Sequence, residues 1–171
     1  MIASRRLLPF LLAALACQPA TTRPPFTPVP EALSSEIRLR VPEATRRLAE
    51  ALKADSIPTH RVRLRDGYIE TQWFNARTGR LASQRRSMGP GVVRVRAWAD
   101  PARPGSSQLT VETSYRPLAD PSLPERELER PVAPNHRVAL KVQAVLVRLV
   151  ERYGGPPPPA AASPEAEQPD Y

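Results

Sequence analysis

The chain has 171 residues, a formal net charge of +8 and one cysteine, Cys17. This length suits a single domain, and a lone cysteine excludes an intramolecular disulfide framework, so the fold must depend on an apolar core. The basic charge favours anionic partners, but the chain has no aromatic-interleaved basic motif or recognised nucleic-acid module, so we expect no nucleic-acid binding.

The first 16 residues have the features of a cleavable signal peptide. Arg5 and Arg6 precede an apolar run from Leu7 to Ala16, and small residues lie directly before Cys17. The run is too short for a membrane-spanning helix, which needs roughly 20 apolar residues. Two kinds of processing would fit these residues. An ordinary secretory peptidase could cut before Cys17, or the signal peptide could be removed after a lipid is attached to Cys17.

The segment Leu15-Ala16-Cys17 resembles the lipobox of bacterial lipoproteins. This resemblance implies that Cys17 is a lipid-attachment site. Gln18 stands where the family's inner-membrane retention signal has aspartate, which implies the outer membrane, with the body facing the periplasm. The Pro-rich stretch Gln18–Pro30 would then act as a semi-rigid tether. We therefore expect a signal peptide at 1–16 and a lipidated cysteine with its tether at 17–34.

The first folded elements are predicted between residues 37 and 55. Apolar and charged residues alternate over 37–41, which indicates a short extended segment that enters the fold. Pro42 suits the first position of a helix, and the apolar spacing that follows predicts a helix ending near Asp55.

A β-hairpin is predicted next. Arginines alternate with apolar residues over 61–65, so a strand would present three guanidinium groups on one face. The dipeptide Asp66-Gly67 is typical of a hairpin turn, and residues 68–74 alternate as a second strand, with Ile69, Thr71 and Trp73 on one face.

Two more strands are predicted, over 93–99 and 109–115, and antiparallel pairing is the simplest arrangement. Residues 75–91 read as a long connection. A Pro-punctuated crossover follows at 117–134, with one helical turn expected at 125–130.

The strongest periodic segment runs from Asn135 to Tyr153, and Gly154 is expected to end this helix as a cap. A second apolar line on the helix includes Leu140 and Val147, which makes these two residues a candidate protein-partner surface. The alternative is that the crossover or the N-terminal segment covers them. Residues 154–171 are rich in proline and alanine, and we expect a disordered tail.

Catalytic and metal-binding patterns are absent from the sequence. His60 and His136 are the only histidines, and no Gly-x-Ser-x-Gly, His-Glu-x-x-His or Gly-rich phosphate loop occurs. We predict no enzyme activity, no metal and no cofactor, and we assign His60, His136 and Asp66 structural or surface roles.

Arginine is concentrated in the central part of the chain. Residues 56–100 hold nine arginines against three acidic residues. Guanidinium groups that share an outward sheet face would bind phosphates or carboxylates, as in an anionic lipid, lipopolysaccharide or glycan. The five expected on that face are Arg61, Arg63, Arg65, Arg94 and Arg96. The alternative is a solvated face that Glu70 and Glu112 partly neutralise.

The run from Val41 to Phe74 resembles the repeating domain of the BamC (NlpB) outer-membrane assembly lipoproteins. In those domains a helix precedes a hairpin whose second strand carries a Gly-x-Ile-x-Thr-x-Trp-like pattern, here from Gly67 to Trp73, and a long helix closes the domain. The resemblance implies a helix-grip fold and an accessory role in an outer-membrane complex. This chain differs in having one domain and a short tether.

Together these observations predict an α+β domain at residues 35–153, in which an antiparallel sheet of about four strands has two helices packed on one face. The leading function is a non-catalytic envelope lipoprotein that acts as an accessory or scaffold for another envelope protein. The alternative is a module that binds an anionic lipid, lipopolysaccharide or glycan through the arginine face.

Overall fold

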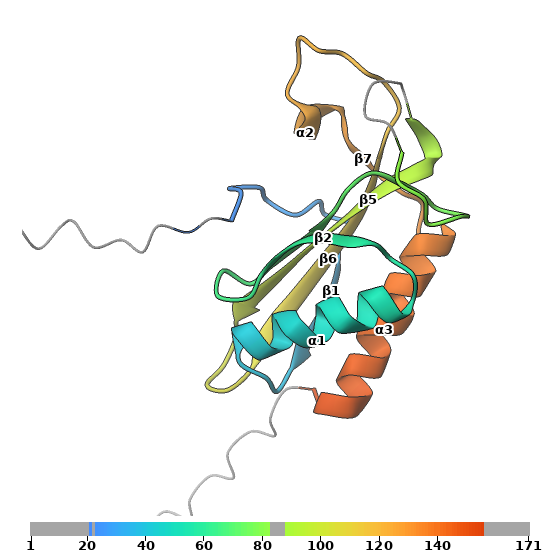
Figure 1. The fold of residues 1–171 in the computed structure, drawn as a ribbon. Helices are drawn as coiled ribbons and strands as arrows, with labels where there is room; N and C mark the ends of the chain where they lie inside the picture. Colours follow the sequence, from blue (N-terminus) through green and yellow to red (C-terminus); the bar gives the residue numbers. More distant parts are fainter. Residues whose placement is uncertain (1–20, 22, 83–87, 156–171) are drawn as a thin grey trace, which may run out of the picture.

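The computed structural model describes residue 21, residues 23–82 and residues 88–155. Within them the chain forms one antiparallel sheet with helices (Figure 1). The elements are β1 (Leu33–Ile37), α1 (Val41–Ala54), β2 (Thr59–Arg63), β3 (Tyr68–Thr71), β4 (Phe74–Asn75), β5 (Met88–Pro101), β6 (Ser107–Arg116), α2 (Glu125–Leu128), β7 (Arg130–Pro131) and α3 (Arg137–Tyr153).

The sheet has the strand order β1-β6-β5-β3-β2, and the short strands β4 and β7 pair with β5 and β6. The two long strands β5 and β6 form its centre, with Arg96 opposite Glu112 and Trp98 opposite Thr110. The hairpin of β2 and β3 extends this line of cross-strand partners, because Glu70 pairs with Arg96 on one side and with Arg61 on the other. Cross-strand partners point to the same face, so this register places Arg61, Glu70, Arg96 and Glu112 on one side of the sheet.

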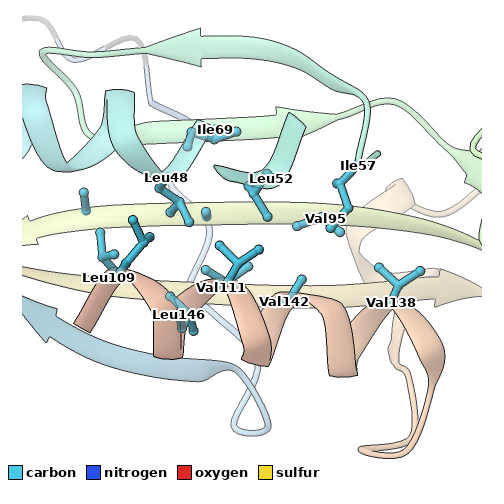
Figure 2. Packing of buried hydrophobic residues seen from close by; sticks show 14 of the residues in the cluster. Leu48, Leu52, Ile57, Ile69, Val95, Leu109, Val111, Val138, Val142 and Leu146 are labelled. Atoms are coloured by element: carbon cyan, nitrogen blue, oxygen red, sulfur yellow. The ribbon is translucent and has the colours of Figure 1, made fainter. Parts of the chain in front are cut away.

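The apolar core lies between the other face of the sheet and the helices α1 and α3. Figure 2 shows Leu48 and Leu52 of α1 and Val142 and Leu146 of α3 close to the strands. Each of these four side chains is at most 3% exposed. The apolar residues at helical spacing in α1 and α3 therefore pack against the alternating apolar residues of the strands in one core.

Local sequence signals explain where the elements begin and end. Pro42 occupies the first turn of α1. His136 caps α3, because its Nδ1 accepts a hydrogen bond from the Val138 N–H at 3.3 Å. Gly154 ends α3 with a φ of 76°. Gly67 in the β2–β3 turn has a φ of 62°, and a Cβ there would lie 2.0 Å from the carbonyl oxygen of Ala99. Only glycine fits this turn.

The second face of the sheet is covered by two irregular segments. One is the crossover at 117–134, which carries α2 and β7. The other is residues 23–32, called the N-terminal strap below. Arg23 of the strap pairs with Asp100 at 2.5 Å, and the Val29 N–H donates to Glu112 at 3.1 Å. The strap is therefore part of the folded body.

The predicted α+β class with an antiparallel sheet is confirmed, and α1 and α3 pack on one face (Figure 1). The count of about four strands and two helices is only roughly matched, since the described residues form seven strands and three helices. The extra strands are β1 and the two-residue strands β4 and β7. The extra helix is α2, a single turn at the position expected for one.

The N-terminal strap and Trp73 differ from the prediction, and β1 and β5 begin earlier than predicted, at Leu33 and Met88. Residues 17–34 were expected to form a semi-rigid tether outside the core, but the part from 23 to 32 bonds to the sheet through Arg23 and Val29 and to α2 through Thr27. Trp73 was expected beside Ile69 and Thr71, but the strand is interrupted at residues 72–73, and Trp73 lies against Arg94 on the second face. The predictions for residues 1–20, including Cys17, and for residues 156–171 lie outside the described residues.

Candidate functional site

The second face of the sheet carries an extended cluster of charged side chains, called the ion cluster below. Strands β3, β5 and β6 supply part of it, and α2 with the residue after it supplies the rest. Its members are Arg94, Arg96, Arg116, Arg126, Glu70, Glu112, Glu125 and Glu129.

Arg96 lies at the centre of this cluster and is 2% exposed. Its Nε donates to Glu70 at 3.0 Å and its Nη1 donates to Glu112 at 3.1 Å. Glu129 accepts from both terminal nitrogens, and the Nη2–Oε1 distance is 2.7 Å. Arg126 donates from Nη2 to Glu112 at 3.0 Å. The buried cation and the carboxylates around it thus compensate one another.

These contacts change the proton affinity of the groups. Burial alone would lower the pKa of Arg96, but hydrogen bonds and the charge of Glu129, followed by those of Glu70, outweigh it and raise the pKa. Burial tends to raise the pKa of Glu125, but the hydrogen bond from Trp73 and the charge of Arg94 lower it overall. Both shifts favour the charged forms of Arg96 and Glu125.

Aromatic side chains surround the cluster. Arg94 lies over the ring of Trp73, with its Cζ 4.4 Å from the ring centroid, and the Trp73 indole donates to Glu125 at 2.8 Å. Phe26 of the N-terminal strap lies between Arg96 and Arg126, at 5.2 Å and 5.6 Å from their Cζ atoms. These contacts are within the range of cation–π attraction.

The cluster corrects the prediction of an open face of five arginines. Arg94 and Arg96 are 6% and 2% exposed and are ion-paired, so neither is accessible to an external anion. Glu70 and Glu112 pair with Arg96, as the alternative of a partly neutralised face predicted. The face is buried, however, and not solvated. The N-terminal strap and the crossover cover this face of the sheet, which the sequence pattern predicted to be open.

The three arginines of the hairpin are in a different position. Arg61, Arg63 and Arg65 are exposed. Arg61 pairs with Glu70 at 3.1 Å, while Arg63 and Arg65 make no ion pair with any described residue. The structure therefore divides the predicted set into a buried structural pair and an accessible group on and beside the edge strand β2.

Comparison with protein-family models finds no match. Comparison with curated proteins finds none either. The candidate sites below are therefore argued from the geometry of this chain.

The outward side of α3 carries the second candidate surface. Leu140 and Val147 are 50% and 49% exposed, and Ala144 between them is exposed as well. Their spacing places the three residues on one line along the helix, called the α3 ridge below. No described part of the crossover or the N-terminal strap covers it, so the apolar line predicted from the sequence is accessible.

Cavities also lie beside α3. A groove of about 580 Å³ between α1 and α3 is lined by charged residues that include Arg47, Glu50 and Arg148. A mainly apolar cavity of about 330 Å³ lies where β1 and β7 leave a gap along β6, with Val29, Val132 and Ala139 in its wall. Its volume is at the lower end of the range for ligand pockets.

The described residues hold no cluster of three or more histidine, cysteine or acidic side chains that is arranged to bind a metal. His60 is exposed and lies 3.4 Å from Gln72, and His136 serves as a helix cap. Within the part of the chain that the structure describes, no helix is long and apolar enough to span a membrane.

Sequence reasoning missed the three members of the ion cluster that the crossover supplies. Glu125, Arg126 and Glu129 lie in a Pro-punctuated segment with no strand pattern. The available signal was charge balance, because the buried arginines of β5 and β6 need nearby carboxylates and Glu70 and Glu112 alone are too few.

Proposed function

We propose that this protein is a non-catalytic lipoprotein of the bacterial envelope that binds another envelope protein through the α3 ridge. The observation that carries the proposal is the half-exposed state of Leu140 and Val147 on one line of a helix whose opposite side is fully packed. An apolar line of this kind loses unfavourable contact with water when a partner covers it.

The chemistry of the ion cluster favours a structural role over catalysis. The charged groups with the strongest mutual contacts form a compensated buried cluster, in which Arg96 and Glu129 are directed at each other. A catalytic site needs titratable groups that face a cleft, with pKa values tuned toward the working pH. The pKa shifts of Arg96 and Glu125 instead strengthen their charged forms.

The helix-grip arrangement belongs to the same proposal. A long C-terminal helix, α3, packs on an antiparallel sheet beside a helix that precedes a hairpin, as the resemblance to BamC-type domains implies. Lipid attachment at Cys17 would keep such a domain on the periplasmic side of the outer membrane. The N-terminal strap shortens the linker to the residues between Cys17 and Arg23.

The partner is tested by purification of the protein from membranes after chemical crosslinking in cells. We expect one or more envelope proteins to co-purify, and we expect Leu140→Asp with Val147→Asp to abolish their recovery. Leu118→Asp is the matched control, because Leu118 is 65% exposed on the crossover. Equal recovery with the ridge variant and the control would contradict the proposal.

The anchor is tested separately with Cys17→Ser and with globomycin, which blocks the lipoprotein signal peptidase. We expect globomycin to cause an unprocessed wild-type precursor to accumulate, and we expect the Cys17→Ser chain to leave the membrane fraction. Normal processing in the presence of globomycin would contradict lipid attachment and leave the partner test unaffected.

An anionic ligand remains the second candidate. Exposure of Arg61, Arg63 and Arg65 supports it, whereas burial of Arg94 and Arg96 removes two of its five residues. The remaining arginines define a smaller surface at one end of the sheet.

A further inference from the structure

The N-terminal strap fixes which end of the domain lies nearest to Cys17. Arg23 pairs with Asp100 at the end of β5, with Nη1–Oδ1 and Nη2–Oδ2 distances of 2.5 Å and 3.3 Å. Only five residues lie between Cys17 and Arg23 in the sequence, so six residue steps join the two. An extended chain of that length spans about 20 Å at most. A lipid on Cys17 would therefore hold this end of the sheet close to the membrane.

Three connections of the fold meet at the same end. The Ala99 N–H donates to the carbonyl of Gly67 in the β2–β3 turn at 2.8 Å. The Ser107 hydroxyl, after the β5–β6 turn, donates to the carbonyl of Leu39 at 2.7 Å, which places the β1–α1 connection there. Figure 1 shows these turns on the side from which the blue N-terminal segment enters the fold.

Three of the exposed arginines on and beside these connections are together called the basic end below. They are Arg40 before α1, Arg63 at the end of β2 and Arg65 in the turn. None of the three makes an ion pair or side-chain hydrogen bond with a described residue. Two nearby acidic residues are occupied, since Asp100 bonds to Arg23 and Glu36 accepts from Ser106 at 2.5 Å.

We propose that the basic end rests on the anionic lipid surface of the membrane to which Cys17 is attached. The proposal rests on the anchorage proposed above and adds an orientation to it. Guanidinium groups bind phosphate through paired N–H donors. A lipid anchor is commonly assisted by basic residues, because each one near an anionic surface adds binding free energy.

This orientation has a consequence for the α3 ridge. The C-terminal end of α3 lies at the basic end, because the Arg38 N–H donates to the carbonyl of Tyr153 at 3.3 Å. Leu140 is 13 residues earlier, which corresponds to about 20 Å along the helix axis. A domain that stands on its basic end therefore holds Leu140 away from the lipid, where a periplasmic partner reaches it.

The test uses a chain from Gln18 to Tyr171, which lacks the leader and the cysteine. All described contacts lie between Thr21 and Gly155, so this chain keeps them. Its partition is measured by sedimentation with vesicles of phosphatidylcholine alone and of phosphatidylcholine with phosphatidylglycerol. We expect binding only to the anionic vesicles and a steep loss with added salt, because screening shortens the reach of surface charges.

Variants then locate the binding surface. We expect Arg40→Gln, Arg63→Gln and Arg65→Gln each to weaken partition about fivefold. The matched control is Arg77→Gln with Arg80→Gln, which removes two exposed charges at the opposite end of β5, where Asn75 pairs with Val92. Circular dichroism tests whether each variant keeps the wild-type fold.

Three results would overturn the proposal. The first is equal binding to neutral and anionic vesicles. The second is a loss in the Arg77/Arg80 control as large as in the basic-end variants. The third is displacement from vesicles by inorganic phosphate at constant ionic strength, which would assign the arginines to a soluble anion. All three leave the globomycin and co-purification tests of the proposed function standing.

Discussion

Arg96 and Glu129 form a two-pronged ion pair in which both side chains are at most 2% exposed. They are 33 residues apart and join the central strand β5 to the residue that follows α2. This pair fastens the crossover to the sheet, and with it the cover of the second face. The stability of that face therefore depends on charge compensation as well as on apolar burial.

Removal of the central cation should destabilise the fold strongly. Arg96→Met leaves Glu70, Glu112 and Glu129 without their shared partner, and we expect the free energy of unfolding to fall by about 3–5 kcal/mol. Urea unfolding followed by tryptophan fluorescence measures this change. The control is Arg46→Met, which breaks an exposed pair with Glu43 on α1 and should cost about 0.5 kcal/mol. Similar losses in the two variants would show that Arg96 contributes no more to stability than an exposed ion pair does.

The β2–β3 turn should tolerate glycine only. In Gly67→Ala the new Cβ would lie 2.0 Å from the Ala99 carbonyl oxygen at a φ of 62°, so backbone must shift. Gly105→Ala is a matched control, because its φ of 82° is equally unfavourable but no atom lies within 4 Å. We expect thermal unfolding to show a clearly larger loss for Gly67→Ala than for Gly105→Ala, whose strain alone costs about 1–3 kcal/mol. Equal midpoints would rule out the close approach.

Acid should weaken the second face through Glu125. Its folded pKa is lowered, so on acidification the unfolded chain binds the proton first, near the ordinary glutamate value of about 4.3. The contribution of Glu125 to stability is therefore complete above that pH and is lost as the pH falls through the folded pKa. We expect Glu125→Gln to be less stable than the wild type at pH 7 and the gap to narrow on acidification. Urea unfolding across this pH range would contradict the assignment if the gap stayed constant.

The N-terminal strap should stabilise the body. A chain that begins at Glu31 lacks Phe26, which lies between Arg96 and Arg126, and lacks the Val29 N–H that donates to Glu112. Loss of a donor to a buried carboxylate costs about 1–3 kcal/mol. Urea midpoints of this chain and of one that begins at Gln18 give the difference directly. Identical midpoints would mean that the strap is only a tether, as its proline content suggests.

Regular periodicity made much of the fold predictable. The heptad-like spacing in α3, the Asp66-Gly67 turn and the alternation in β5 and β6 each depend on residues close in sequence. The second face was not predictable in this way, because its cover comes from Pro-rich segments without periodicity. Phe26 and Glu129 both contact Arg96, although they are 103 residues apart in sequence. No local sequence pattern predicts such a long-range contact.

The two candidate surfaces also differ in how far the sequence predicted them. The sequence identified the apolar line of Leu140 and Val147 on the helix, but only the structure shows that both residues are about half exposed. Accessibility of an arginine in a strand depends on what lies over the sheet. Arg63 lies on the edge strand and stays exposed, whereas Arg94 lies in a central strand under α2 and is buried, although the two have the same alternating pattern.

Site-specific photocrosslinking in cells tests the central claim most directly. A photoreactive amino acid at position 140 or 147 should give a discrete crosslinked adduct with an envelope protein in the membrane fraction, and the same amino acid at position 118 or 123 should give none. Leu118 and Leu123 are suitable controls because they are 65% and 45% exposed outside α3. Adducts of equal yield from all four positions, or none from positions 140 and 147, would contradict a partner-binding role for α3.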